Sequence, residues 1–160
     1  MPMSTLLVVG DGPVSSVLAP MAELLGWPTT VVTTMDEVAA SLADADAVVV
    51  TSHDETVDAA ALKAALERQP AYVGAMGSRK SQARRREWLT DHGVSDQAQA
   101  LIHGPAGLDI GADSPPEIAL AILAELVATV RGRTDIGSIK DREGPIHPEL
   151  GPGEAFCPTG

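Results

Sequence analysis

The sequence is poor in cysteine and in aromatic residues. Cys157 is the only cysteine among 160 residues, so no disulfide can form within the chain. Aromatic residues make up 2% of the composition, and valine, leucine, isoleucine and alanine must therefore build the core. With 44% hydrophobic and 21% charged residues, the composition is otherwise that of a globular domain. From the scarcity of cysteine we expect a cytoplasmic protein.

Long hydrophobic runs are also missing. The longest, such as Leu6–Val9 and Ala47–Val50, fall far short of the roughly 20 apolar residues that a membrane-spanning helix needs. Residues 1–5 carry no basic stretch before the first apolar run, which argues against a signal peptide. The sequence therefore predicts a protein without a membrane span.

Positive charge is scarce, because the chain contains 11 basic and 22 acidic residues and its net charge is −11. Such a chain lacks the basic face that general nucleic-acid binding requires. Five of the eleven basic residues nevertheless fall together: Arg79, Lys80, Arg84, Arg85 and Arg86. Most runs of this kind are solvated helix faces. This one begins at the start of a predicted helix, where positive charge would suit a phosphate-bearing ligand.

Short apolar runs alternate with helical patterns along the first 131 residues. Strands are predicted at 5–9, 29–33, 47–51, 71–75 and, more weakly, 100–102. Helices are predicted at 13–25, 37–42, 56–68, 78–92 and 115–131. The alternation indicates an α/β, Rossmann-like three-layer domain. Its sheet should be mainly parallel, with about five or six strands and helices on both faces.

The last part of the chain has a different composition. Glycine and proline make up ten of the 29 residues in 132–160, and no helical or strand period is visible. We interpret residues 1–131 as one domain and residues 132–160 as an extended tail or a partner-binding arm.

The first predicted strand ends in a glycine-rich turn, Gly10-Asp-Gly-Pro-Val-Ser15, which opens a helix. It is a Gly-x-Gly-x-x-Ser version of the dinucleotide-binding fingerprint, with serine in place of the third glycine, which mostly serves helix–strand packing. The candidate cofactor-binding residues are Gly10, Asp11, Gly12, Pro13 and Val14. A purely structural turn is the alternative. The carboxylate of Asp11 would repel a phosphate unless it points away.

The end of the second predicted strand carries Thr33 and Thr34. A nicotinamide-binding domain usually has an acid here for the adenosine ribose, and Asp36 falls too late unless the loop bends back. Either threonine could donate a hydrogen bond to a ribose or phosphate, although a threonine that ends a strand is more often structural. Selective NAD binding is therefore not favoured.

The third predicted strand is followed by Ser52, His53 and Asp54. These residues either line a ligand site or cap the next helix. The four histidines of the chain show no paired ligand spacing, so we assign no metal site. No nucleophile, base and orienting group can be matched, so no residue is assigned as catalytic.

Two later loops complete the candidate site. Gly77 permits close backbone approach, Ser78 can cap the helix and bind an anion, and Arg79 offers a fork of donors to a phosphate. The alternative is a glycine turn with an exposed arginine. The second loop contributes the candidate residues His103, Gly104, Pro105 and Gly107. Irregular glycine-rich loops at the carboxyl edge of a parallel sheet are usually functional.

The segments Tyr72–Arg79 and Ile102–Ala112, with the Ser114–Ile118 segment that follows, resemble one known family. They are similar to the C-terminal Rossmann-like half of XdhC/CoxI proteins, which are accessory proteins of xanthine dehydrogenase and related molybdenum hydroxylases. The resemblance runs from about residue 6 to about residue 131. Family members usually carry an additional N-terminal domain with a cysteine-containing motif, whereas this sequence starts directly at the Rossmann half.

The resemblance implies a maturation module for molybdenum hydroxylases of the xanthine or CO dehydrogenase type. It would bind molybdopterin cofactor, a nucleotide or NAD(P). Its implied partners are a molybdenum hydroxylase apoenzyme, a separate protein like the N-terminal part of XdhC, and a second copy of the chain as a homodimer. An NAD(P)-dependent oxidoreductase is one alternative, and a degenerate Rossmann domain used for dimerisation or regulation is another. Whether the chain is an enzyme stays open at this point.

Overall fold

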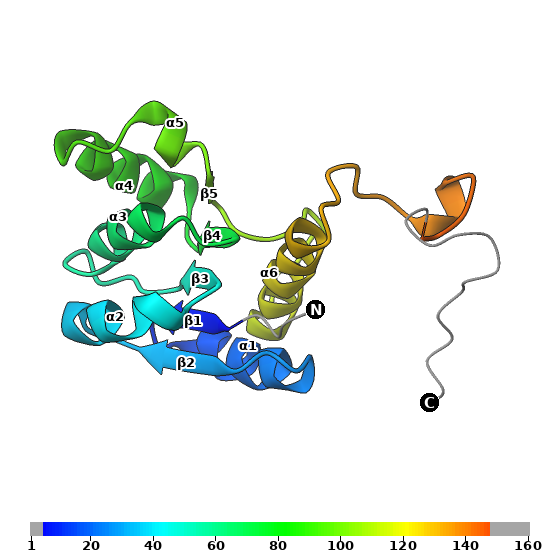
Figure 1. The fold of residues 1–160 in the computed structure, drawn as a ribbon, viewed down its shortest axis with the longest axis horizontal. Helices are drawn as coiled ribbons and strands as arrows, with labels where there is room; N and C mark the ends of the chain where they lie inside the picture. Colours follow the sequence, from blue (N-terminus) through cyan, green and yellow to red (C-terminus); the bar gives the residue numbers. More distant parts are fainter. Residues whose placement is uncertain (1–4, 148–160) are drawn as a thin grey trace.

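The computed structural model describes residues 5–147, which contain one five-stranded parallel sheet (Figure 1). The strands are β1 (Leu6–Val9), β2 (Thr29–Val32), β3 (Ala47–Val50), β4 (Tyr72–Ala75) and β5 (Ile102–His103). Their order across the sheet is β2-β1-β3-β4-β5, and each neighbouring pair is parallel. The predicted α/β fold is confirmed, including the weak fifth strand.

Helices cover both faces of the sheet (Figure 1). One face carries α1 (Pro13–Leu24) and α6 (Pro115–Val130), which pack against each other. The other face carries α2 (Met35–Ser41), α3 (Asp58–Arg68) and α4 (Arg79–Asp91). Shorter elements are the 3₁₀ turn η1 (Leu42–Asp44), the helix α5 (Asp96–Gln99) and the 3₁₀ turn η2 (Ile139–Asp141).

The core consists of two hydrophobic layers, one on each side of the sheet. Leu7 of β1 and Val48 of β3 pack towards α2, α3 and α4, whereas their neighbours Leu6 and Val49 pack towards α1 and α6. Successive side chains of a strand point to opposite faces, and here both faces are buried. This is why the strands appear in the sequence as continuous apolar runs rather than alternating ones.

Capping residues explain where several helices begin. Ser114 caps α6 in a capping box with Glu117, as the sequence predicts. Thr34 and Glu37 form a second capping box, so α2 begins at Met35 rather than at residue 37. Ser95 caps the short helix α5, which the sequence prediction missed.

The start of one more helix and the conformation of the tail also differ from the prediction. Helix α3 begins at Asp58 rather than at residue 56, because Thr56 belongs to a turn closed by Asp54. The part of the tail that is described, residues 132–147, contains the 3₁₀ turn η2 and is not extended throughout. Cys157 and the rest of the tail, 148–160, lie outside the described residues.

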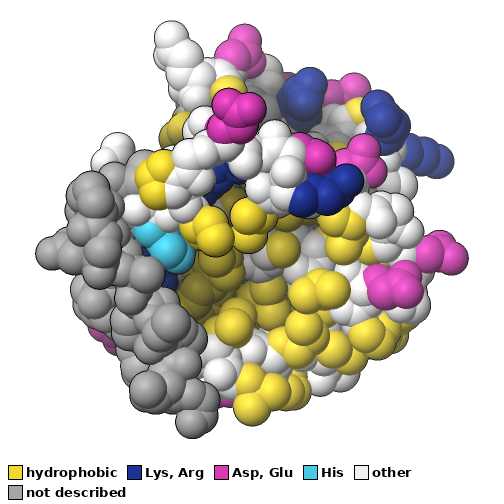
Figure 2. All heavy atoms as spheres, turned by 90° about the vertical axis from the view of Figure 1, so that its right-hand side faces the viewer, with side chains coloured by type: hydrophobic (Ala, Val, Ile, Leu, Met, Phe, Trp, Pro, Cys, Tyr) yellow, Lys and Arg dark blue, Asp and Glu magenta, His cyan; other side chains and the backbone are white. Residues whose placement is uncertain are grey.

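The side of the molecule that carries α6 is rich in hydrophobic surface. Figure 2 shows hydrophobic side chains gathered over this side, which faces right in Figure 1. On α1 and α6 the exposed ones include Leu24, Leu120 and Val127. No helix between residues 5 and 147 has both the length and the apolar character needed to cross a membrane.

Candidate functional site

The loops that follow the five strands all lie at the carboxyl edge of the sheet. Because β1 is flanked by β2 on one side and β3 on the other, the chain reverses direction across the sheet between β1 and β3. Open parallel sheets bind ligands at such a switch point. The loops after β1 and β3 are joined there, since the N–H groups of Thr51 and Ser52 both donate to the carbonyl of Val9 at 2.9 Å. The structure therefore brings together two of the predicted segments.

The residues that follow β3 leave no room for a side chain at Gly10. Gly10 has φ of +125°, and a Cβ atom there would lie 2.4 Å from Oγ1 of Thr51 and 2.7 Å from the backbone nitrogen of Ser52. Ser15 and Thr51 share a buried hydrogen bond of 2.7 Å directly below this turn. The serine that replaces the third glycine of the fingerprint thus joins α1 to β3.

The rest of the first turn divides into exposed and buried residues. Asp11, Gly12 and Pro13 are exposed, and a Cβ atom at Gly12 would meet nothing within 4 Å. Val14 is buried and packs in the hydrophobic layer under α1 and α6. The Val14 side chain therefore belongs to the core, and the assignment of Val14 to the ligand site stays a prediction.

The end of β2 does carry an acid. The carboxylate of Glu37 reaches back from α2 and accepts hydrogen bonds from the hydroxyl of Thr34 at 2.9 Å and its N–H at 3.2 Å. The side chain of Thr34 in turn accepts from the Glu37 N–H. The hydrogen bonds that the Glu37 carboxylate accepts, above all the one from the Thr34 hydroxyl, lower its pKa. The expectation that no acid reaches this position is wrong, and the Thr-x-x-Glu pattern was the signal that could have shown it.

Thr33 and Thr34 are thereby engaged in local structure. Thr34 caps α2, and the Thr33 hydroxyl lies 3.4 Å from the Glu37 carboxylate. These contacts give the threonines a structural role, and a hydrogen bond from either one to a ribose or phosphate stays a prediction.

The Ser52–Asp54 loop forms a polar turn. Ser52 Oγ accepts from the Asp54 N–H at 3.1 Å, and Asp54 accepts from the hydroxyl of Thr56 at 2.6 Å and its N–H at 2.9 Å. These bonds from Thr56 lower the pKa of Asp54. The prediction that Ser52 or Asp54 caps the next helix is wrong, because α3 begins after Val57 without a side-chain cap. His53 is exposed beside this turn.

The loop after β4 leads directly into α4. Ser78 caps this helix by accepting from the Ser81 N–H at 3.2 Å, and Arg79 is exposed in the first turn. Gly77 has φ of +137°, and a Cβ atom there would lie 3.1 Å from a guanidinium nitrogen of Arg85. The close approach that Gly77 permits is thus to Arg85, and contact of Arg79 with an anion stays a prediction.

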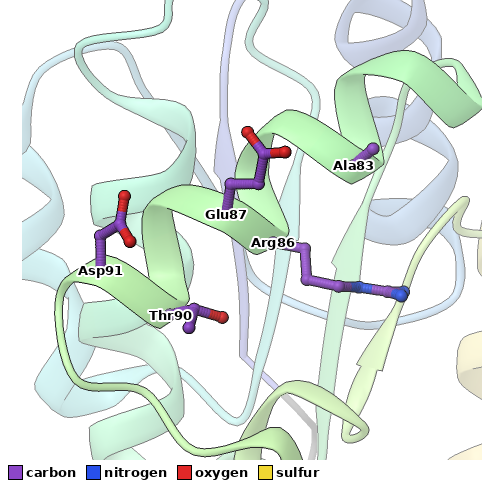
Figure 3. Close-up of a pocket in the computed structure, with 5 residues that line it drawn as sticks. All are labelled: Ala83, Arg86, Glu87, Thr90 and Asp91. Carbon is purple, nitrogen blue, oxygen red and sulfur yellow. The ribbon is translucent and has the colours of Figure 1, made fainter.

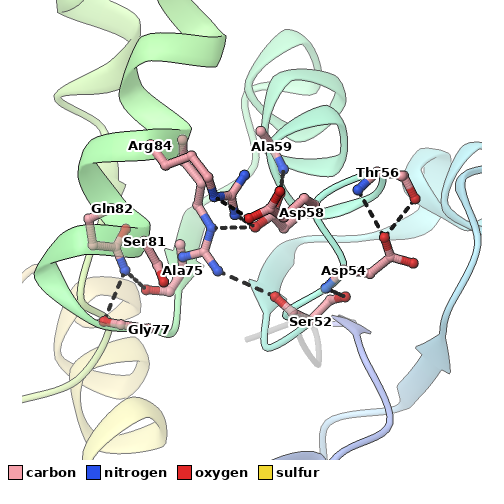
Figure 4. A network of polar contacts seen from close by, with 12 residues as sticks. Ser52, Asp54, Thr56, Asp58, Ala59, Ala75, Gly77, Ser81, Gln82 and Arg84 are labelled. Carbon is pink, nitrogen blue, oxygen red and sulfur yellow. Dashed lines mark hydrogen bonds and ion pairs between the residues drawn. The ribbon is translucent and has the colours of Figure 1, made fainter.

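A buried ion pair lies under the loops after β3 and β4 (Figure 4). Asp58 is 0% exposed and Arg85 2% exposed, and Nε of Arg85 donates to Oδ2 of Asp58 at 2.8 Å. The guanidinium also donates to the carbonyls of Met76 at 2.7 Å and Ser52 at 3.3 Å. Arg84 donates to the same Asp58 oxygen from a more exposed position.

This ion pair changes the interpretation of the basic run on α4. Burial raises the pKa of Asp58, but the hydrogen bonds from Arg84, Arg85 and the Ala59 N–H outweigh it and leave the pKa below its usual value. Asp58 is thus a carboxylate at neutral pH. Two of the five clustered basic residues are engaged with it, so the run is neither a uniformly solvated face nor wholly available to a ligand. No local pattern in the sequence indicates this pairing, which spans 27 positions.

His103 and Gly107 are tied to α6 through Glu125. One oxygen of Glu125 accepts from the Tyr72 hydroxyl at 2.7 Å and from the Gly107 N–H at 3.0 Å, and lies 3.3 Å from Nδ1 of His103. The His103 ring stacks on Tyr72 with 4.6 Å between centroids. Burial and the Glu125 carboxylate raise the pKa of Tyr72 far above its usual value. Sequence reasoning missed Glu125, which lies in an apparently apolar helix.

The other two residues of this loop lie on its exposed side. Gly104 and Pro105 are exposed, and a Cβ atom at Gly104 would lie 2.6 Å from the side-chain oxygen of Gln82. The Gln82 amide donates to the carbonyl of Ala75 at 2.9 Å. The loop after β5 is therefore held against α4 on one side and α6 on the other.

A hollow on the outer surface of α4 is separate from the sheet edge. It has a volume of about 510 Å³ and is lined by Ala83, Arg86, Glu87, Thr90 and Asp91 (Figure 3). All five residues come from one helix, so no second element closes over a ligand there. Within residues 5–147, no cluster of three or more histidine, cysteine or acidic side chains could hold a metal ion.

Residues 6–126 match the XdhC Rossmann domain. The chain belongs to this family. The family resemblance seen in the sequence is thus confirmed over nearly the predicted range. The XdhC domain described here is also 30% identical over 131 residues to the molybdenum cofactor insertion chaperone PaoD of Escherichia coli, covering 81% of this chain and 41% of PaoD.

Two further proteins are similar to this XdhC domain. An uncharacterised E. coli protein, YqeB, is 36% identical over 70 residues, which are 44% of this chain and 13% of YqeB. A crystal structure described as a xanthine dehydrogenase from Bacillus halodurans superimposes with a TM-score of 0.65 at 26% identity, covering 86% of this chain and 46% of that one. The chain thus spans less than half the length of each of these proteins.

Proposed function

We propose that this XdhC domain is an accessory module in the maturation of molybdenum hydroxylases of the xanthine or CO dehydrogenase type. At the carboxyl edge of its sheet it binds a phosphate-bearing ligand, either molybdopterin cofactor or a nucleotide. The observation that carries the proposal is the β1/β3 switch point, with an open glycine turn at Gly12 next to the Ser52–Asp54 loop. The similarity to PaoD, a molybdenum cofactor insertion chaperone, supports it.

The charges at the helix starts favour an anion at two particular places. Helices α2 and α6 have acidic residues in their first turns, whereas α1 and α4 have none. A helix N-terminus attracts an anion through its free N–H groups, and a carboxylate in the same turn opposes this. The starts of α1, at Gly12 and Pro13, and of α4, at Ser78 and Arg79, are therefore the phosphate-binding part of the proposed site.

The proposed partners are those that the family resemblance implies, and the similarity to PaoD supports the first of them. They are a molybdenum hydroxylase apoenzyme, a protein resembling the remaining part of XdhC, and a second copy of this chain. We further propose residues 1–131 as the ligand-binding domain and residues 132–160 as an arm that contacts one of these partners.

Thermal shift measurements test the ligand. The domain is heated alone and with molybdopterin cofactor, NAD, NADP, CTP or ATP. A ligand at a hundred times its dissociation constant stabilises the folded state by roughly 2.7 kcal/mol. We expect stabilisation by molybdopterin cofactor or by a nucleotide such as CTP or ATP. No stabilisation by any of the five would exclude the proposed ligand binding, and stabilisation by NADP alone would exclude the preferred ligand class.

Replacement of Arg79 tests the site. Arg79→Ala should weaken a phosphate-bearing ligand by about 1.5–3 kcal/mol, because a charge-assisted hydrogen bond is lost. Arg86→Ala is the matched control, since Arg86 lies on the same helix but lines the outer hollow. Equal affinities for the two variants would place Arg79 outside the site.

A second candidate function, binding of a nicotinamide dinucleotide, is favoured by Glu37. Its carboxylate lies at the end of β2, where such domains bind the adenosine ribose. Glutamine can also complete a capping box, so Glu37→Gln removes the charge and retains the cap. A loss of NAD binding without a loss of molybdopterin binding would support this candidate. Unchanged NAD binding would leave Glu37 with its capping role.

A further inference from the structure

Three nitrogen atoms of the buried Arg85 side chain each contact a different segment. Nε donates to Asp58 in α3, Nη1 to the carbonyl of Met76 after β4, and Nη2 to the carbonyl of Ser52 after β3. A planar guanidinium holds its donors in a fixed fork, which the single ammonium of a lysine cannot reproduce. The two carbonyls thus have a set distance and direction from one another.

The loop after β4 is packed tightly onto this guanidinium. The Cβ position of Gly77 lies 3.1 Å from Nη1 and 3.4 Å from Nη2 of Arg85, so any side chain there would press on the arginine. From the outer side, Arg84 joins Asp58 to Glu55, with 3.3 Å between Nε of Arg84 and the Glu55 carboxylate. Arginines 84 and 85 therefore connect α4 to the whole turn that follows β3.

Stability alone is a poor reason for this arrangement. Removing two charges from water costs about as much as their attraction returns, and an apolar pair of similar volume is often as stable. An apolar pair offers no directional bonds to loop carbonyls. What distinguishes the Asp58–Arg85 pair from such a pair is the fixed position that it gives to the backbone at Ser52 and Met76.

We propose that Asp58 and Arg85 are positioning residues that lock the loops after β3 and β4 into one rigid half of the ligand site. Asp58 orients the guanidinium, and Arg85 then holds both loops. The inference rests on the proposed function in that the locked loops lead to Ser78 and Arg79. It adds that Arg85 itself, in spite of its charge, contacts no ligand.

Hydrogen exchange of the full chain tests the lock without any ligand. In the wild type, the amides of 52–57 and 76–81 should open as one cooperative unit. Arg85→Lys should raise exchange in both segments on the order of tenfold to a hundredfold, because hydrogen bonds from a charged donor are lost. Tyr72→Phe is the matched control, since it removes a buried hydrogen bond on the α6 side and should leave both segments unchanged.

The double variant Asp58→Leu/Arg85→Met separates positioning from stability. It leaves no unpaired buried charge, so we expect it to fold with stability near that of the wild type. Its exchange in 52–57 and 76–81 should still rise as in Arg85→Lys. Protected loops in this variant would overturn the proposal, as would independent opening of the two segments in the wild type.

A binding measurement with molybdopterin cofactor links the lock to the site. Both Arg85 variants should bind it at least tenfold more weakly than the wild type and Tyr72→Phe. In these variants the loops become ordered only on binding, and the free-energy cost of ordering them lowers the affinity. Wild-type affinity in variants with fast-exchanging loops would contradict the positioning role. If the wild type itself does not bind the cofactor, the proposed ligand fails while the exchange results still decide the lock.

Discussion

Each face of the sheet carries a carboxylate that holds neighbouring loops, and the two are bound in different ways. On the α3 and α4 face, Asp58 is fully buried and pairs with arginine side chains. On the α6 face, Glu125 is 16% exposed and accepts from the phenol of Tyr72 and a backbone N–H, with His103 beside it. A charge without access to water needs an opposite charge, whereas one near the surface can be held by neutral donors.

The difference matters for function because the two carboxylates hold different loops. Asp58 acts through Arg85 on the loops after β3 and β4, next to the switch point. Glu125 fixes the loop after β5 onto α6 through the Gly107 N–H. The first region should therefore be both the more costly to disturb and the more closely linked to ligand binding.

The largest effect is expected for Asp58→Ala. It leaves Arg85 buried without its opposite charge, which costs about 3–5 kcal/mol of stability. Denaturant unfolding followed by circular dichroism measures this loss. A loss below that of Tyr72→Phe would reverse the comparison between the two faces.

A smaller effect is expected for Tyr72→Phe. This change removes one hydrogen bond to the Glu125 carboxylate and costs about 1.5 kcal/mol, because the carboxylate retains the Gly107 N–H and partial contact with water. The same unfolding experiment measures it. A loss as large as that of Asp58→Ala would show that Glu125 behaves as a fully buried charge.

Acidification should remove the stabilisation that comes from Asp58. The pKa of Asp58 is lower in the folded chain than the unfolded value of about 3.9, so the unfolded chain binds this proton more readily. The stability from Asp58 is therefore complete above that value and is lost as the pH falls through the folded pKa. The pKa values of Glu37, Asp54 and Glu117 are also lowered, so all three add to the acid loss.

Asp58→Asn isolates the Asp58 contribution. Unfolding free energies of the wild type and this variant are measured between pH 7 and pH 2. The difference between them should shrink towards low pH, because only the wild type loses the charged pair. A constant difference across this range would show that the charge of Asp58 does not stabilise the fold.

The smallest effect is expected for an exposed ion pair on the same helix as Asp58. Lys63 and Glu67 lie 3.5 Å apart with 38% and 66% of their side chains exposed. Lys63→Ala should change stability by no more than about 0.5 kcal/mol, since such i,i+4 pairs contribute little. A much larger loss would mean that burial is not what separates Asp58 from surface charges.

Features set by neighbouring residues were predictable. The five strands and the Ser114 cap follow from patterns that extend over a few positions. The Thr34–Glu37 capping box carried an equally local signal but was not recognised, and with it the acid at the end of β2 was missed. The fingerprint does not tell which residues of the turn face the core, so only the tertiary structure shows that the Val14 side chain is buried.

The sequence by itself determined the parallel α/β fold and the loops at the carboxyl edge, because hydrophobic period and turn residues act locally. The family followed from the resemblance of the segments that begin at β4 and β5 to known proteins. Only the tertiary structure decided which side chains near this edge are available to a ligand. Arg84 and Arg85 resemble their neighbour Arg86 in the sequence, yet they bind an aspartate 26 and 27 positions away. The physical reason is that burial of a charge depends on what packs above it, and that is set by elements distant in the chain.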